Sequence, residues 1–142
     1  MKDGFIRVGA ATPILKVADC RYNAQAVIDL AGQAADRQVK LLVFPELCLT
    51  GYSCGDLFLQ RTLLEGALEA LAAVAGACAD HKMLVVVGLP LEQRGKLYNT
   101  AALLYQGRIL GLVPKCNLPT YNEFYEGRHF SPAPEGNSLV TV

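Results

Sequence analysis

The order of apolar and polar residues predicts three strands in the first part of the chain. Residues 5–12 alternate around Ile6, Val8 and Ala10 and end at Pro13, which is typical of a strand. Residues 40–44 and 83–88 hold continuous apolar runs, which predict strands that are buried on both faces. We therefore expect these two runs to lie inside a sheet that is covered on both sides.

Two amphipathic helices are predicted between these strands, over residues 21–38 and 57–79. Asp19 is a suitable N-cap for the first helix. The expected inner positions are Ala24, Val27, Ile28, Ala31 and Ala35 in the first helix and Leu64, Ala67, Leu68, Leu71, Ala75 and Cys78 in the second. Strands that alternate with helices predict right-handed βαβ units with parallel strands, and hence an α/β fold.

The pattern changes in the second part of the chain. Two runs typical of strands, 98–105 and 108–113, are separated only by Gln106-Gly107, which suits a tight hairpin and predicts a mixed sheet. Residues 118–135 show no clear period, and residues 138–142 are again typical of a strand. A strand at this position predicts that the sheet is incomplete, so that the chain is part of a larger domain; a short edge strand closing a complete domain is the alternative.

Composition and charge exclude several classes of function. The 142 residues contain 13 basic and 13 acidic side chains, a balance that argues against a nucleic-acid partner. Hydrophobic residues make up 52% of the chain, yet no apolar run approaches the ~20 residues that cross a membrane. We therefore expect a cytoplasmic protein with no membrane partner.

The five cysteines are predicted to be reduced thiols, because their number is odd and their spacing forms no disulfide framework. With only two histidines in the chain, no metal site is expected. Cys116 follows Lys115, but neighbouring residues of an extended segment point to opposite faces, so the two side chains are not expected to share a substrate. Cys48, Cys54 and Cys116 are therefore interpreted as packing or surface thiols.

Glu46 and Lys115 occupy equivalent places, because each follows an apolar strand and a proline. Ligands of open α/β sheets bind at the carboxyl ends of strands, so we expect both side chains in one crevice. There the carboxylate could accept a proton while the ammonium stabilises an oxyanion. A structural ion pair, or a solvated Glu46 on a loop, is the alternative. The turn-rich residues 47–56 are a further candidate for function.

The chain contains five distinctive short motifs, LVFPEL at 42–47, TGYS at 50–53, PK at 114–115, LPTY at 118–121 and EFYEGR at 123–128. Together they resemble the glutaminase domains of glutamine-dependent NAD synthetases, a branch of the nitrilase superfamily. The resemblance extends over essentially the whole chain. It identifies residues 1–142 as the N-terminal part of a carbon-nitrogen hydrolase domain.

The resemblance implies an αββα sandwich in which a cysteine attacks the carboxamide of glutamine. Glu46 matches the general base, Lys115 matches the lysine that stabilises the tetrahedral intermediate, and Glu126 matches a second glutamate near that lysine. Tyr121 and Phe124 lie where this branch contacts glutamine or the path of ammonia.

One departure from the family is that its Cys-Glu-Asp nucleophile motif does not occur in residues 1–142. We therefore predict that this chain alone does not hydrolyse glutamine and contains no cofactor. The parent enzyme is expected to be a homo-oligomer whose synthetase domain binds ATP and Mg and amidates deamido-NAD. A stand-alone nitrilase-type amidase and a non-catalytic assembly module of the same fold are the alternatives.

Overall fold

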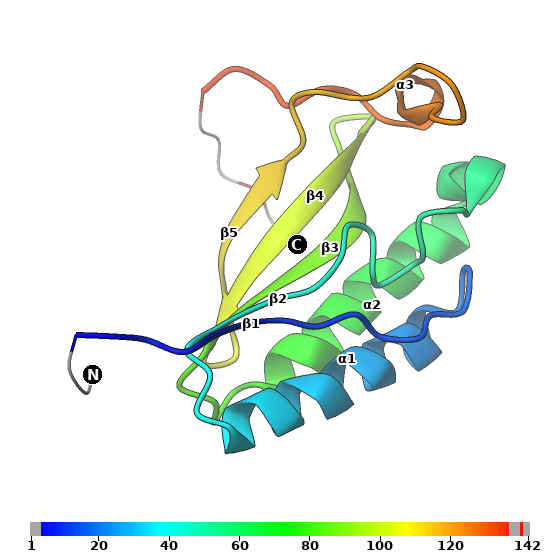
Figure 1. The fold of residues 1–142 in the computed structure, drawn as a ribbon. Helices are drawn as coiled ribbons and strands as arrows, with labels where there is room; N and C mark the ends of the chain where they lie inside the picture. The colour runs from blue at the N-terminus through cyan, green and yellow to red at the C-terminus, as the bar shows by residue number, and fades with distance from the viewer. Residues whose placement is uncertain (1–3, 137–139, 141–142) are drawn as a thin grey trace.

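A single five-stranded sheet with two long helices beside it forms the centre of the computed structural model, which describes residues 4–136 and residue 140 (Figure 1). In chain order the elements are β1 (Val8–Ala10), α1 (Cys20–Asp36), β2 (Leu41–Val43), the 3₁₀-helix η1 (Gly55–Leu59), α2 (Arg61–Ala77), β3 (Leu84–Gln93), β4 (Lys96–Tyr105), β5 (Arg108–Pro114) and α3 (Glu126–His129). The strand predicted over 138–142 lies outside the described residues, because only Val140 of that run is described.

The strands follow one another across the sheet in the order β1-β2-β3-β4-β5. The first three are parallel to each other, whereas β4 is antiparallel to both β3 and β5. Helix α1 connects β1 to β2 and α2 connects β2 to β3, so the chain contains two successive βαβ units. The predicted α/β class and the mixed sheet are both confirmed.

Two hairpins with two-residue turns build the antiparallel half of the sheet. Residues 106–107 have φ angles of 48° and 76°, and residues 94–95 have φ angles of 51° and 71°. Positive φ at both central positions is the signature of the type I′ turn that suits a twisted hairpin. The hairpin at residues 106–107 was predicted. The hairpin at residues 94–95 was not, because β3 continues to Gln93 instead of ending near residue 88.

Pro90 is the reason that the predicted strand was too short, since proline is normally excluded from strand interiors. In the structure Pro90 pairs with Asn99 of β4. On the side of β3 away from β4, no strand of the described residues lies beside Pro90, because β2 pairs with β3 only as far as Val86. The carbonyl of Asn99 accepts the backbone N–H of Lys115 at 2.8 Å, on the side of β4 that faces away from β3. The missing N–H of Pro90 therefore breaks no hydrogen bond of the sheet.

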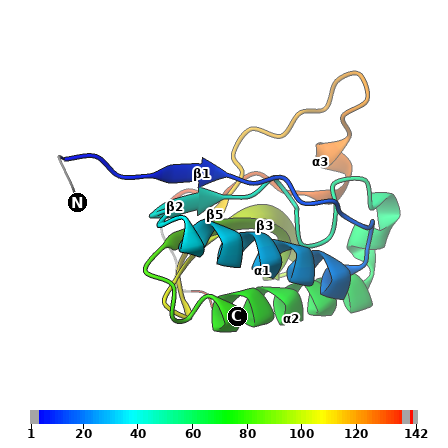
Figure 2. The ribbon, with the colours of Figure 1, turned by 60° about the horizontal axis from the view of Figure 1, so that its bottom comes forward.

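Both long helices cover the same face of the sheet (Figure 2). The Asp19 carboxylate caps α1 by accepting the Tyr22 N–H at 3.0 Å, as predicted. The second helix was predicted to begin at residue 57, which is wrong, because Gln60 is extended and separates η1 from α2. Within residues 4–136 and 140, no helix is both long and apolar enough to cross a membrane.

Small side chains line the contact between the helices and the sheet. Of the predicted inner positions of α1, Ala24, Val27 and Ala31 are buried, whereas Ile28 and Ala35 are only partly covered. In α2 the buried stripe is rotated from the predicted one, since Leu64 and Leu68 are only partly covered. The residues that α2 buries are Leu63, Ala67, Ala70, Leu71, Val74 and Ala75. This rotation follows from packing against α1 on one side and β3 on the other.

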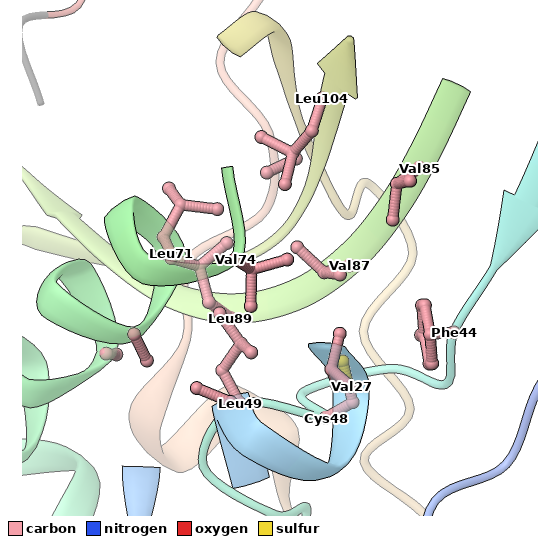
Figure 3. Packing of buried hydrophobic residues seen from close by; sticks show 14 of the residues in the cluster. Val27, Phe44, Cys48, Leu49, Leu71, Val74, Val85, Val87, Leu89 and Leu104 are labelled. Atoms are coloured by element: carbon pink, nitrogen blue, oxygen red, sulfur yellow. The ribbon is translucent and has the colours of Figure 1, made fainter. Parts of the chain in front are cut away.

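The main core lies between the helices and the sheet, where side chains of β3 and β4 meet those of α1 and α2 (Figure 3). Val85, Val87 and Leu89 of β3 are fully buried on this side. The opposite face of the sheet is open: Val43 of β2 and Val113 of β5 are 40% and 57% exposed. The prediction that β2 is buried on both faces is therefore wrong for the described residues.

Candidate active site

Glu46 lies in a tight turn that follows β2. The Phe44 N–H still donates to the Val86 carbonyl at 2.9 Å, which extends the pairing with β3 by one residue. The chain then reverses: Leu47 adopts a φ of 52°, and the Gly51 N–H donates to the Leu47 carbonyl at 2.7 Å. This turn places Glu46 at the carboxyl end of the parallel strands, the edge where open α/β sheets bind ligands.

Gly88 of β3 allows the turn to approach the sheet. A Cβ atom at this position would lie 2.3 Å from the Leu47 nitrogen and 2.9 Å from the Pro45 carbonyl oxygen, which no side chain tolerates. The Gly88 carbonyl also accepts the Leu49 N–H at 3.1 Å. The position of Glu46 therefore depends on a glycine that lies in a different strand.

The Lys115 ammonium bridges two carboxylates. Its Nζ donates to Glu46 Oε1 at 2.8 Å and to Glu126 Oε1 at 2.9 Å. Lys115 directly follows β5, whereas Glu126 is the first residue of α3, so three separate segments meet here. The Glu126 side chain is 4% exposed, against 30% for Lys115 and 40% for Glu46. One carboxylate of the cluster is thus buried and the other is accessible.

Tyr52 completes the surroundings of Glu126 by donating its hydroxyl to Oε1 at 2.8 Å. Partial burial, the hydrogen bond to Glu126 and the negative charges of Glu126 and Glu46 raise the pKa of Tyr52 to about 12. The phenol is therefore a proton-bearing donor throughout the physiological range. Glu126 Oε2 is buried and has no hydrogen-bond partner in the described part of the chain.

Lys115 is held in its charged form. Partial burial acts to lower the pKa of Lys115, but the hydrogen bonds to Glu46 and Glu126, together with their charges, outweigh it and raise that pKa above its usual value. A lysine that stays protonated cannot serve as a general base at neutral pH, but it can stabilise negative charge on a substrate oxygen. The proton acceptor of the cluster has to be a carboxylate.

Asn99 is a member of the site that the sequence prediction missed. Its Nδ2 donates to Glu46 Oε1, the same oxygen that Lys115 contacts. The side chain is buried in β4. A signal was present in the sequence, because Asn99 and Thr100 interrupt an apolar strand, and a buried amide in such a strand needs a polar partner.

Two clefts flank the cluster. A cleft of about 320 Å³ on the helix-free side of the sheet is lined by Val43, Glu46, Asn99 and Lys115, among others. A second cleft, of about 260 Å³, is lined by Tyr52, Ser53, Phe58, Glu126 and His129, among others. A small molecule in the first cleft would therefore meet both the accessible carboxylate and the ammonium.

Tyr121 and Phe124, the predicted substrate-binding residues, lie in the segment between Lys115 and α3. Their ring centroids are 5.8 Å apart, and Phe124 also contacts Tyr52 edge-on at 6.5 Å. Tyr121 is 65% exposed. The two rings therefore join the cluster through Tyr52, and neither makes a hydrogen bond to Glu46 or Lys115 among the residues described.

A second ion-pair cluster, also missed in the sequence, ties α3 to η1. The Asp56 carboxylate accepts Arg128 Nε at 2.9 Å and Arg128 Nη2 at 3.0 Å, and it lies 2.9 Å from His129 Nε2. The hydrogen bonds from Arg128 and His129 lower the pKa of Asp56 to about 2. Arg128 lies two residues after Glu126 in α3, so these ion pairs hold the short helix that carries Glu126.

None of the five cysteine thiols makes a hydrogen bond to Glu46, Lys115 or Glu126 in the described part of the chain. All five are free; Cys116 is exposed and the other four are buried. Burial raises the pKa of Cys48 and of Cys20 to about 11, which makes both thiols poor nucleophiles. No group of His, Cys, Asp and Glu side chains able to hold a metal ion occurs in residues 4–136.

The chain is similar to bacterial proteins that are several times longer. The glutamine-dependent NAD(+) synthetase of Mycobacterium tuberculosis H37Rv is 45% identical over 139 residues, which are 98% of this chain and 20% of that protein. The enzyme of the same name from Xanthomonas campestris is 34% identical over 139 residues, or 96% of this chain and 25% of that protein. The chain therefore spans a fifth to a quarter of these relatives.

Solved structures agree with this similarity. The glutamine-dependent NAD(+) synthetase of Cytophaga hutchinsonii superposes with a TM-score of 0.89 at 32% identity, over 96% of this chain and 23% of that one. An amidase variant of the nitrilase superfamily from Nesterenkonia has a TM-score of 0.78 at 23% identity, over 96% and 52% of the two chains, and is a likeness of fold alone. The resemblance predicted from the motifs and the nitrilase-like fold are confirmed.

The comparison with family models covers nearly the whole sequence. Residues 6–142 match the family described as carbon-nitrogen hydrolase. The match includes all three residues of the bridged cluster, Glu46, Lys115 and Glu126. The chain belongs to the carbon-nitrogen hydrolase family.

Proposed function

We propose that this chain forms the carboxylate and ammonium part of a glutamine amidohydrolase site, in a polypeptide that uses the ammonia to convert deamido-NAD to NAD. The observation that carries this proposal is the Lys115 ammonium, which bridges the accessible Glu46 and the buried Glu126. Similarity to glutamine-dependent NAD synthetases supports glutamine as the substrate. The proposal places the nucleophilic cysteine outside residues 1–142, since four of the five thiols of this chain are buried and none is hydrogen-bonded to the cluster among the described residues.

The reaction assigns one role to each charged group. Glu46 removes the proton of the thiol, and the sulfur attacks the carboxamide carbon of glutamine. Lys115 stabilises the negative oxygen of the tetrahedral intermediate, while Glu126 holds the lysine in place. As the C–N bond breaks, the protonated Glu46 returns its proton to the leaving ammonia. Water then attacks the thioester carbon and gives a proton to Glu46; the C–S bond breaks, the sulfur takes that proton back, and glutamate is released.

The remaining roles follow from the same similarity. Tyr121 and Phe124 contact the glutamine substrate or border the path of the ammonia. A synthetase domain outside this chain would bind ATP, Mg and deamido-NAD.

The test is an assay of the complete polypeptide that the gene for this chain encodes. We expect ammonia release from glutamine, and NAD formation from deamido-NAD and ATP with either glutamine or free ammonia. NAD formation from free ammonia but not from glutamine would contradict the proposed role of this chain. Hydrolysis of other amides without NAD formation would indicate a stand-alone amidase instead.

A second experiment assays the separate chain of residues 1–142. We expect it to release no ammonia from glutamine. Release that survives Cys116→Ala but is lost in Glu46→Ala would reveal a nucleophile within this chain, and would contradict the proposal that the thiol comes from elsewhere.

A further inference from the structure

We propose that Asn99 is a positioning residue that selects which oxygen of Glu46 accepts the proton; this inference rests on the proposed function. Asn99 contacts both Glu46 and Lys115, the first through its side chain and the second through its backbone. Its side-chain Nδ2 donates to Glu46 Oε1, and its backbone carbonyl accepts the Lys115 N–H at 2.8 Å. A single residue of β4 therefore holds the turn after β2 and the segment after β5.

Both donors converge on the same carboxylate oxygen. Glu46 Oε1 accepts from Asn99 Nδ2 and from Lys115 Nζ, whereas Oε2 accepts no hydrogen bond from the residues that the structure describes. An oxygen with two donors is already satisfied and is the weaker base of the pair. Oε2 is thus the oxygen that takes the proton, while the two hydrogen bonds to Oε1 hold the carboxyl group in place.

The surroundings of Asn99 suit this role. Asn99 is 4% exposed, while the Glu46 side chain that it holds is 40% exposed. The amide is therefore fixed by packing, and the carboxylate reaches the cleft from a rigid support. Lys115, Glu126 and Tyr52 are the charged and titratable groups of the described chain that face Glu46 from the other segments.

The competing interpretation is that Asn99 only fills space in β4, and two variants separate the possibilities. Asn99→Asp keeps the shape of the side chain but replaces the amide donor with an acceptor next to the Glu46 carboxylate. Asn99→Ala removes the donor and leaves a gap. If Asn99 only fills space, Asn99→Asp should be milder than Asn99→Ala. If Asn99 donates to Glu46, Asn99→Asp should be the more harmful variant, because it adds charge repulsion to the loss of the donor.

The experiment measures kcat and KM for ammonia release from glutamine in the complete gene product. We expect Asn99→Ala to lower kcat by roughly 10- to 100-fold with KM within about twofold, since a misplaced catalytic group costs up to about 100-fold. Asn99→Asp should lower kcat several-fold further. Tyr98→Phe is the matched control, because it removes a hydroxyl from the other buried neighbour of Asn99 in β4, which does not line the cleft of Glu46, and it should leave kcat unchanged.

Two results would overturn the role of Asn99 while leaving the proposed function intact: kcat of Asn99→Asp equal to or above that of Asn99→Ala, or kcat of both within about twofold of the unchanged enzyme. If Asn99→Ala is too unstable to be assayed, Asn99→Asp decides alone: a kcat within about twofold of the unchanged enzyme would overturn the role of Asn99. An unchanged gene product that makes NAD from ammonia but not from glutamine would instead overturn the proposed function, and the role of Asn99 with it.

Discussion

The two ion-pair clusters that hold the segment around α3 differ in burial, and this difference separates chemistry from anchoring. In the first cluster Lys115 bridges Glu46 and Glu126, and the Glu126 side chain is 4% exposed. In the second, Asp56 pairs with Arg128 and His129 while the Asp56 side chain is 63% exposed. Charges in the buried cluster depend on one another, whereas the Asp56 carboxylate and the Arg128 guanidinium of the exposed cluster are both hydrated.

The largest expected effect comes from Lys115→Met, which leaves the buried Glu126 charge without its cation. Loss of one partner of a buried pair costs about 3–5 kcal/mol, and because Lys115 is nearly a third exposed we expect about 2–3 kcal/mol here. Loss of an oxyanion donor should also lower kcat by roughly 10²–10³-fold. Urea unfolding and the ammonia assay of the gene product measure the two effects.

The double variant Lys115→Met with Glu126→Gln sharpens this prediction. Removing the charge at both positions should restore most of the lost stability but none of the lost activity. Full recovery of activity would contradict a role for Lys115 in stabilising the oxyanion.

The next effect concerns the backbone that positions Glu46. Gly88→Ala would place a Cβ 2.3 Å from the Leu47 nitrogen, so the turn has to move. We expect a loss of about 1–3 kcal/mol, typical of overpacking, and a fall in kcat as Glu46 is displaced. Gly76→Ala is the matched control: nothing lies within 4 Å of that Cβ in α2, and the protein should gain up to about 1 kcal/mol. Unfolding and kcat of Gly88→Ala that match this control would contradict the prediction.

A smaller effect is expected from Tyr52→Phe, which removes the hydroxyl that donates to Glu126 Oε1. The expected loss is about 1 kcal/mol, below the ~1.5–3 kcal/mol of a buried hydrogen bond to a charged group, because Tyr52 is partly exposed. The pKa of Tyr52 is raised from about 10 to about 12, so its contribution is complete below pH ~10 and lost as pH rises through 12. Melting temperatures of the two proteins should converge in that window; a constant difference would contradict it.

The smallest effect is expected from Asp56→Asn in the exposed cluster. The pKa of Asp56 is lowered to about 2, so the stability that its charge provides is present above pH ~4 and lost as pH falls through 2. The variant should melt slightly below the unchanged protein at neutral pH, with the difference vanishing toward pH 2 and in 1 M salt. A difference as large as that of Lys115→Met would show that the two clusters are equivalent.

The comparison also shows which features the sequence could reveal. Glu46 and Lys115 were found because each follows a strand and a proline, a pattern that local sequence shows directly. Their placement in one crevice needs only the rule for the carboxyl ends of strands. Asp56 and Arg128 carry no such pattern, and their pairing depends on how η1 and α3 meet in space.

Other features depend on contacts between distant residues. Asn99 and Gly88 act on Glu46 from β4 and β3, and the register that brings them there follows from a hairpin at residues 94–95 that Pro90 concealed. The helices were easier to predict, since a stripe at helical spacing is local. The rotation of the α2 stripe was not, because it depends on the neighbouring helix.

The most direct test of the account compares Glu46→Gln with Glu65→Gln in the complete gene product. Glu65, which forms an exposed ion pair with Arg61 on the surface of α2, serves as the control. We predict that Glu46→Gln abolishes ammonia release from glutamine while NAD formation from free ammonia continues, and that Glu65→Gln changes neither rate. Glutamine hydrolysis by Glu46→Gln at the rate of the unchanged protein would contradict the role of Glu46 as the proton acceptor.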